Sequence, residues 1–319
     1  MERRTFIKAA SVAAATIAAG TPARDSIAQP VPNSSGTAPP KSKAPANACD
    51  CHHHIYDPAR FPFAPAPGRY PPPSNGTVAD YRLLQKRIGT TRSVVVQQRN
   101  NAVDNAVTVD AVAQLSPNSR GVAVLRPTVT DAELKKLDAG GIRGIRFTLG
   151  DPSSAVVTVD MIEPLAKRIA PLGWHIQLNL SGEHIVERAD LLRGLPTQLV
   201  FYHLGNPPVA QGINHPSHAI IRELVDKGKA WVKLSGAYSN SKIGPPDYPE
   251  ATTVAQAFVK AAPERMVWGS DWPHPGKPDG SKPDDALLFD LLTVWAPDEA
   301  TRNRILVANP ETLYGFPKS

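Results

Sequence analysis

The sequence predicts an α/β protein, a single-domain (β/α)8 barrel of the TIM type. Eight short and almost entirely apolar runs alternate with longer amphipathic stretches, which is typical of parallel strands buried on both faces and separated by helices. About 270 residues remain after an N-terminal leader and linker, within the size range of one barrel. A doubly wound sheet is the alternative, but the sequence has no Gly-x-Gly-x-x-Gly fingerprint and no phosphate-binding loop.

The boundaries of these elements follow from the apolar pattern and from the residues that start and stop helices. Thr130 and Glu133 form a predicted capping box, and Gly89 and Gly173 are suited to helix C-termini. The predicted strands are 48–54, 93–97, 121–125, 144–147, 175–179, 199–203, 231–235 and 266–270. The clearest helical patterns are 77–88, 131–139, 159–171, 216–227 and 250–262.

The N-terminal part of the chain is predicted to lie outside the fold. Residues 1–28 resemble a twin-arginine signal peptide, because Arg3 and Arg4 precede an apolar stretch too short to span a bilayer. Residues 29–47 are rich in Pro, Ser and Ala, which predicts a disordered linker before a barrel over residues 48–319. No later segment is suited to crossing a membrane. The protein is therefore expected in the periplasm, exported by the twin-arginine machinery.

The charge balance narrows the class of partner. The formal net charge is +6, and it falls to +4 without the leader, which holds four basic and two acidic side chains. The charges are interspersed, without a basic run or interleaved aromatic residues, so no nucleic-acid partner is predicted. A mild positive balance fits a small anionic substrate.

The first predicted strand carries the densest group of reactive side chains. In an extended strand His52 and His54 share one face, and Asp50 falls on that face by the same alternation. One imidazole is often a core residue, whereas two at this spacing can hold one metal ion or one substrate atom. Cys49 and Cys51 are predicted to pack outward as small buried hydrophobes, because neighbours at i and i+2 rarely meet disulfide geometry.

Further side chains are expected to join these histidines. In such a barrel the active site lies at the C-terminal ends of the strands. His203 after the sixth strand and Asp271 after the eighth are therefore predicted to converge with His52 and His54. Such a set leaves an open position for water, as in a catalytic divalent metal site. In the alternative interpretation, His203 caps a strand end and Asp271 forms a turn.

Other polar residues near the strand ends are predicted to bind the substrate. Arg146 lies between apolar neighbours in the fourth strand, and a charge there needs a partner if it is buried. It could hold a substrate anion or form an ion pair across the barrel mouth. Asn179, Tyr238 and Gln98 are predicted to line the same pocket.

Four motifs at these positions resemble signatures of the amidohydrolase superfamily. They are Asp50–His54, Phe201–Gly205, Trp231–Gly236 and Val267–His274. The similarity covers residues 48–316. The branch that it resembles is the amidohydrolase-related family, the hydrolases related to 2-pyrone-4,6-dicarboxylate lactonase and galactarolactone isomerase.

The resemblance implies an enzyme that opens a small, carboxylated lactone by hydrolysis. His52, His54 and His203 would bind a metal ion or polarise the carbonyl group. Asp271 would deprotonate the attacking water, and Arg146 would hold a substrate carboxylate. One divalent ion, Zn or Mn, is the expected cofactor, with metal-independent catalysis as the alternative.

The chain also departs from the pattern that it resembles. It reads Ser235-Gly236-Ala237 where those lactonases carry a further arginine soon after Ser-Gly, so one anchor for a dicarboxylate is absent. The complete His-x-His and aspartate set favours hydrolysis over isomerisation. A decarboxylase of an unsaturated carboxylic acid, a lactone isomerase and a non-catalytic binding protein are the alternative functions.

Overall fold

The computed structural model describes Met1 and residues 29–64, 76–149 and 156–318. The predicted signal peptide, beyond its first residue, lies outside the described residues. Among the described residues, no helix has the length and apolar character needed to cross a membrane.

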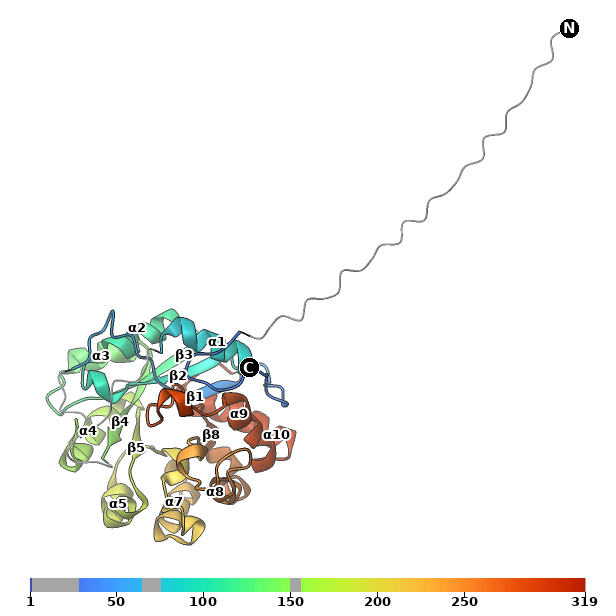
Figure 1. The fold of residues 1–319 in the computed structure, drawn as a ribbon. Coiled ribbons are helices and arrows are strands. Elements are labelled where there is room, and N and C mark those ends of the chain that lie inside the picture. Colours follow the sequence, from blue (N-terminus) through green and yellow to red (C-terminus); the bar gives the residue numbers. More distant parts are fainter. Residues whose placement is uncertain (2–28, 65–75, 150–155, 319) are drawn as a thin grey trace.

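Eight strands form one sheet whose order follows the sequence from β1 to β8. Every neighbouring pair is parallel, and Figure 1 shows the strands at the centre of a ring of helices. Backbone hydrogen bonds from Asp271 N to His52 O (2.7 Å) and from His54 N to Trp272 O (2.8 Å) join β1 to the segment that follows β8. The predicted (β/α)8 barrel is therefore confirmed. The strands are β1 Cys49–His53, β2 Arg92–Val96, β3 Ser119–Ala123, β4 Ile142–Thr148, β5 His175–Asn179, β6 Leu199–Phe201, β7 Ala230–Leu234 and β8 Met266–Trp268.

The helices cover the outer face of the sheet, and the sequence signals at their ends act as predicted. Thr130 and Glu133 form the capping box, while Gly89 (φ +82°) and Gly173 (φ +68°) end helical segments in the left-handed conformation. The helices are α1 Val78–Ile88, α2 Ala106–Gln114, α3 Asp131–Ala139, α4 Ile162–Ile169, α5 Gly182–Glu187, α6 Ala189–Gly194, α7 Pro216–Asp226, α8 Pro249–Ala261, α9 Asp285–Trp295, α10 Glu299–Asn303 and α11 Asn309–Tyr314.

The buried side chains form two groups that the sheet separates. The larger group fills the layer between the strands and the helices. The smaller group lies inside the barrel, where valines from β2, β3, β6 and β8 meet Tyr314 and Phe316 near the C-terminus. Apolar side chains thus fill one part of the barrel interior, which also contains the polar side chains of His175, Gln177 and Lys233.

A β-bulge in β1 changes which side chains point inward. Asp50 pairs with Ser93 and His53 with Val95, so β1 holds one more residue than β2 between these pairs. Cys51 belongs to the interior group, and Asp50 accepts hydrogen bonds outside it. The predictions that the cysteines pack outward and that Asp50 shares the face of the histidines are wrong, because the bulge interrupts the alternation. Both cysteines are buried and free, without a disulfide.

Asp50 instead links β1 to α1 and to the loop after β8. Its carboxylate accepts from Tyr81 Oη (3.1 Å), from Ser270 Oγ (2.6 Å) and from the backbone amide of His52 (3.1 Å). These contacts fasten the end of β8, which carries Asp271, against the strand that carries the two histidines.

Asp50 is expected to make the stability of the fold depend on pH. Burial raises its pKa from 3.8 to about 6, although hydrogen bonds from Ser270, His52 and Tyr81 oppose the rise. Between pH 4 and 6 the folded state keeps a proton that the unfolded state has lost, so the unfolding free energy falls as pH rises. The loss is about 3 kcal/mol. Chemical denaturation of wild type and Asp50→Asn across this range measures it. Parallel curves for the two proteins would contradict the assignment.

The segment 29–47 is ordered against the barrel, so the predicted disordered linker is wrong. Val31 is 3% exposed, and Pro32 O accepts a hydrogen bond from Trp272 Nε1 (2.7 Å). The backbone amides of Lys41 and Ser42 both donate to the carboxylate of Asp290 in α9 at 2.9 Å. The composition predicted disorder, but these buried and hydrogen-bonded groups offset the entropy lost on ordering the segment.

Candidate active site

The carboxylate at the mouth of the barrel comes from a tight turn that follows β8. Asp271 adopts a left-handed conformation (φ +64°), which aspartate tolerates better than most residues. Its backbone amide donates to His52 O, and its side chain is buried. Asp271 thus forms the turn that the alternative interpretation predicted, and this turn also directs its carboxylate towards β1.

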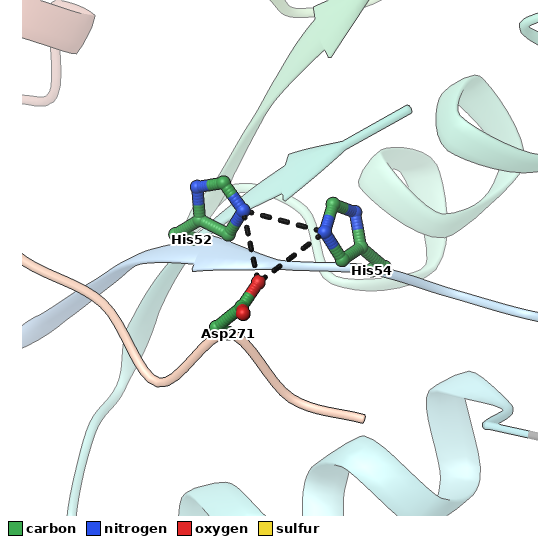
Figure 2. A group of neighbouring side chains, drawn as sticks. All are labelled: His52, His54 and Asp271. Carbon is green, nitrogen blue, oxygen red and sulfur yellow. Dashed lines mark hydrogen bonds and ion pairs between the residues drawn. The ribbon is translucent and has the colours of Figure 1, made fainter. Parts of the chain in front are cut away.

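Asp271 and the two histidines of β1 form a compact triangle (Figure 2). Asp271 Oδ1 lies 3.2 Å from His52 Nε2 and 3.5 Å from His54 Nε2, and the two Nε2 atoms are 3.3 Å apart. All three ligand atoms lie within 4.8 Å of one another. These three side chains are therefore positioned to bind a metal ion.

His203 lies near the other carboxylate oxygen of Asp271. Its Nε2 lies 3.8 Å from Asp271 Oδ2, and its Nδ1 is 2.9 Å from Ser235 Oγ. The structure thus brings the four predicted residues together, but only three of them form the compact ligand group. His203 does not lie in that group.

Two glycines create the space that this arrangement needs. A Cβ on Gly269 would lie 2.5 Å from His52 Cβ, and a Cβ on Gly236 would lie 2.7 Å from His203 Nδ1. Both distances are shorter than a non-bonded contact allows. The glycines therefore let the strand ends approach the imidazoles closely.

The charge states in the site follow from burial and from the hydrogen bonds. Burial alone would raise the pKa of Asp271, but the imidazoles of His203, His52 and His54 together hold it well below its usual value. Burial lowers the pKa of each of these histidines. At neutral pH the site therefore contains one carboxylate among neutral imidazoles, which is the state that a general base requires.

Tyr238 contacts the carboxylate directly. Its hydroxyl donates a hydrogen bond to Asp271 Oδ2. Burial raises the pKa of Tyr238 well above its usual value, and the charge of Asp271 raises it further, so the phenol stays protonated. The sequence predicted a pocket-lining residue, whereas Tyr238 holds one oxygen of the carboxylate and leaves Oδ1 to the histidines.

Arg146 lies beside this cluster and is held in place by neutral groups. Its Nη1 donates to Gln97 O and its Nη2 to Thr148 Oγ1, both at 2.7 Å, and its guanidinium lies 5.4 Å from the centre of the Tyr202 ring. Within the described residues, Arg146 forms no ion pair and its buried Nε has no hydrogen-bond partner. The described residues therefore do not form the structural ion pair that was the alternative prediction for Arg146.

A small cavity opens next to Arg146. Two arginines contribute to its wall, and none of the three triangle residues is among the lining side chains. The lining residues are Gln97, Arg99, Ala102, Val124, Arg146, Thr148, Val156 and Val157. The end of β2 connects the two regions, because His54 Nδ1 donates to Val96 O and Arg146 donates to the next carbonyl, Gln97 O.

Two predicted substrate-binding residues have other partners in the fold. Gln98 caps the short 3₁₀ helix Arg99–Asn101, where its Oε1 accepts from the amide of Asn101 (3.0 Å). Asn179 Oδ1 accepts from Asn206 Nδ2 (3.1 Å), which joins the end of β5 to the loop after β6. Neither residue is among the lining residues of the cavity beside Arg146, and their role in substrate binding stays a prediction.

Lys233 is a polar residue at the site that the sequence reasoning did not select. It lies in the middle of β7, is fully buried, and extends across the barrel interior to the underside of His52. Burial lowers its pKa to about 7. The signal was present, because Lys233 interrupts an apolar strand just as Arg146 does.

The fold agrees with comparisons with known proteins. The chain belongs to the amidohydrolase family, whose profile matches residues 49–316. The structure is similar to a solved structure of an Agrobacterium tumefaciens protein, with a TM-score of 0.81 and 30% sequence identity. The match covers 90% of this chain and 99% of that one.

Three characterised relatives act on lactones, as their names state. A 2-pyrone-4,6-dicarboxylate hydrolase of Comamonas testosteroni is 34% identical, with coverage of 86% of this chain and 92% of the relative. A 4-sulfomuconolactone hydrolase of Rhizobium radiobacter is 34% identical (88% and 93%), and a D-galactarolactone isomerase of Agrobacterium fabrum is 31% identical (88% and 94%). The chain is an amidohydrolase-superfamily enzyme of the lactonase-like hydrolase type, and these relatives support a lactonase-type function.

Proposed function

We propose that the protein hydrolyses a small lactone that carries a separate anionic group. The observation that carries the proposal is the ionised Asp271, buried among three neutral imidazoles, beside a cavity with two arginines in its wall. Asp271 can act as the base that deprotonates water, and the positively charged arginines can bind the anionic group of the substrate.

In the proposed reaction, Asp271 takes a proton from water while the water oxygen attacks the lactone carbonyl carbon. An imidazole N–H that faces the same space stabilises the negative charge that develops on the carbonyl oxygen. The tetrahedral intermediate then collapses, and the bond between the carbonyl carbon and the ring oxygen breaks. The proton on Asp271 passes to the departing oxygen, so the products are a carboxylic acid and a hydroxyl group. Tyr238 keeps the carboxylate oriented throughout.

A divalent ion is compatible with the donor set in the triangle. Two imidazoles and a carboxylate are ligands that Zn²⁺ and Mn²⁺ accept, and His52, His54 and Asp271 would hold the ion. When bound, it would act as a Lewis acid and lower the pKa of a bound water.

The anionic group is proposed to bind at Arg146 and Arg99. Arg146 is buried and its Nε is unsatisfied within the described residues, so a carboxylate or sulfonate oxygen could accept from it. The names of the relatives, a dicarboxylate hydrolase and a sulfomuconolactone hydrolase, support such a substrate. The chain lacks the arginine expected after Ser235-Gly236, so we propose an anionic lactone in general and not 2-pyrone-4,6-dicarboxylate in particular.

Isomerisation, decarboxylation and ligand binding without turnover are the alternatives. The isomerase relative favours the first of these by name. A buried ionised carboxylate among imidazoles supports catalysis over ligand binding alone, because a binding protein would not need such a group.

A panel of lactones tests the proposal. The panel contains 2-pyrone-4,6-dicarboxylate, a muconolactone, a sugar-acid lactone and an uncharged δ-lactone, and ring opening is followed as acid release with a pH indicator. We expect release from at least one anionic lactone and little from the uncharged one. Carbon dioxide release, an isomeric lactone, or ligand retention without product would each reject hydrolysis in favour of the matching alternative.

We also propose that the reaction takes place in the periplasm. Arg3 and Arg4, followed by a short apolar stretch, support export through the twin-arginine pathway. Replacing both with lysine should shift the protein from the periplasmic to the cytoplasmic fraction, while Arg24→Lys in the same leader should not. Unchanged fractionation of the double variant would contradict the proposal.

A further inference from the structure

Lys233 makes three polar contacts, and one of them bears on which nitrogen of His52 carries the proton. Its Nζ lies 2.8 Å from Cys51 O, 2.8 Å from Gln177 Oε1 and 2.9 Å from His52 Nδ1. Two of these atoms are oxygens that can only accept. The third contact is also a donation from Nζ, because His52 Nε2 faces the carboxylate oxygen Asp271 Oδ1 at 3.2 Å and therefore carries the imidazole proton, which leaves Nδ1 as the acceptor.

The neighbouring contacts support this direction. The amide nitrogen of Gln177 lies 2.9 Å from His175 Nε2 and 3.3 Å from Tyr314 Oη, which leaves its carbonyl oxygen to face Lys233. The lysine is enclosed in the barrel interior, with the ring of Tyr202 4.7 Å from Nζ. No water-facing orientation competes with these three acceptors.

The consequence for His52 is a defined tautomer. A neutral imidazole with an acceptor at Nδ1 carries its proton on Nε2, and that atom faces Asp271 Oδ1 at 3.2 Å. His54 is the opposite case, because its Nδ1 must donate to the carbonyl oxygen of Val96 at 2.7 Å. Its Nε2 therefore carries a lone pair, which can accept from His52 Nε2 at 3.3 Å. The two histidines of β1 are chemically different although both lie close to Asp271 Oδ1, at 3.2 and 3.5 Å.

We infer that Lys233 is a positioning residue that keeps His52 a hydrogen-bond donor at Nε2, aimed at the space where a substrate carbonyl oxygen would lie. This inference rests on the proposed lactone hydrolysis for the identity of that oxygen. A metal ion on His52 would need the lone pair of Nε2 and hence a proton on Nδ1, which would point at the donors of Lys233. Lys233 therefore also weakens metal binding by the triangle, although the three ligand atoms have suitable spacing.

The tautomer can be read without a substrate and without a variant at Lys233. In the metal-free wild-type protein with ¹⁵N-labelled histidine, we expect His52 to show a protonated Nε2 and an unprotonated Nδ1, and His54 to show the reverse. The His52→Gln spectrum assigns the signal. A proton on Nδ1 of His52 would overturn the inference whatever the protein catalyses.

Metal affinity provides the second readout. Zinc affinity is measured by competition with a chromophoric chelator for wild type, Lys233→Met and the control Lys229→Met. Lys229 lies just before β7 and donates to the carbonyl oxygens of Arg193 and Leu195 at the end of α6. We expect Lys233→Met to bind zinc at least about tenfold more tightly than wild type, and Lys229→Met to match wild type. Equal or weaker zinc binding by a folded Lys233→Met would contradict the inference.

Turnover separates this inference from the proposed function. With an active lactone, Lys233→Met should lower kcat by about 10²-fold and leave KM within twofold, because a donor to the developing oxyanion is misplaced. If no lactone reacts but the tautomer and the zinc affinities are as expected, the proposed function fails and the role of Lys233 towards His52 remains. An unchanged kcat in Lys233→Met would reject its catalytic consequence.

Discussion

Asp271→Asn is expected to lower kcat for lactone hydrolysis by about 10²- to 10⁴-fold with little effect on the fold. Asparagine has almost the same shape and still accepts the hydrogen bond of Tyr238 through its carbonyl oxygen. It cannot take a proton from water. The variant therefore removes the base and leaves the substrate site, so KM should change much less than kcat.

A matched control separates this loss from a general effect of removing a carboxylate. Asp104 lies in the loop after β2, where Oδ1 accepts from the amide of Ala106, and asparagine can make the same contact. Asp104→Asn should retain wild-type kcat, and both variants should unfold at the same denaturant concentration as wild type. If Asp271→Asn retained more than a tenth of wild-type kcat, Asp271 would not be the base.

Arg146→Gln is expected to lower kcat/KM for anionic lactones by about 10- to 100-fold, because one charge-assisted hydrogen bond contributes about 1.5–3 kcal/mol. Glutamine keeps a polar group at the cavity but loses the charge and the unpaired Nε of the guanidinium. An uncharged lactone does not use that charge. Its kcat/KM should therefore be nearly the same in both proteins, and the ratio between the two substrates is the quantity to measure.

Arg143 provides the control on the same strand. It lies three residues earlier in β4, faces the outside of the barrel and pairs with Asp138. Arg143→Gln should leave the substrate preference unchanged. An equal loss for charged and uncharged lactones in Arg146→Gln would mean that Arg146 supports the barrel mouth rather than an anion.

The fold could be predicted from the sequence because its strongest signal is periodic. Apolar runs buried on both faces have few alternatives to parallel strands, and the capping box at Thr130 marks a helix start by local hydrogen bonding alone. The positions of His203 and Asp271 followed from one further rule, that functional side chains gather at the C-terminal ends of barrel strands.

Features that depend on partners distant in sequence could not be predicted. The bulge in β1 arises from pairing with β2, and it turned Asp50 away from the histidines against the simple alternation. The order of residues 29–47 depends on acceptors such as Asp290, about 250 residues away. Lys233 meets His52 only across the closed barrel, so its residue type was visible but its partner was not.

Gln98 and Asn179 illustrate the same limit on the scale of one side chain. Both follow strands at the correct end of the barrel, and the strand-end rule selected them for that reason. Local caps and loop contacts use their amides instead. A strand-end position thus predicts which residues can reach the site, but it does not predict the local hydrogen bonds that these side chains form.

Incorporation of heavy oxygen from solvent tests the central claim most directly. The lactone panel is incubated with the protein in H₂¹⁸O for a single turnover, and the masses of the products are measured by mass spectrometry. Hydrolysis at Asp271 predicts a ring-opened acid that carries one ¹⁸O atom, formed by wild type and not by Asp271→Asn. A product of unchanged mass and no label would show isomerisation, loss of carbon dioxide would show decarboxylation, and either would contradict the account.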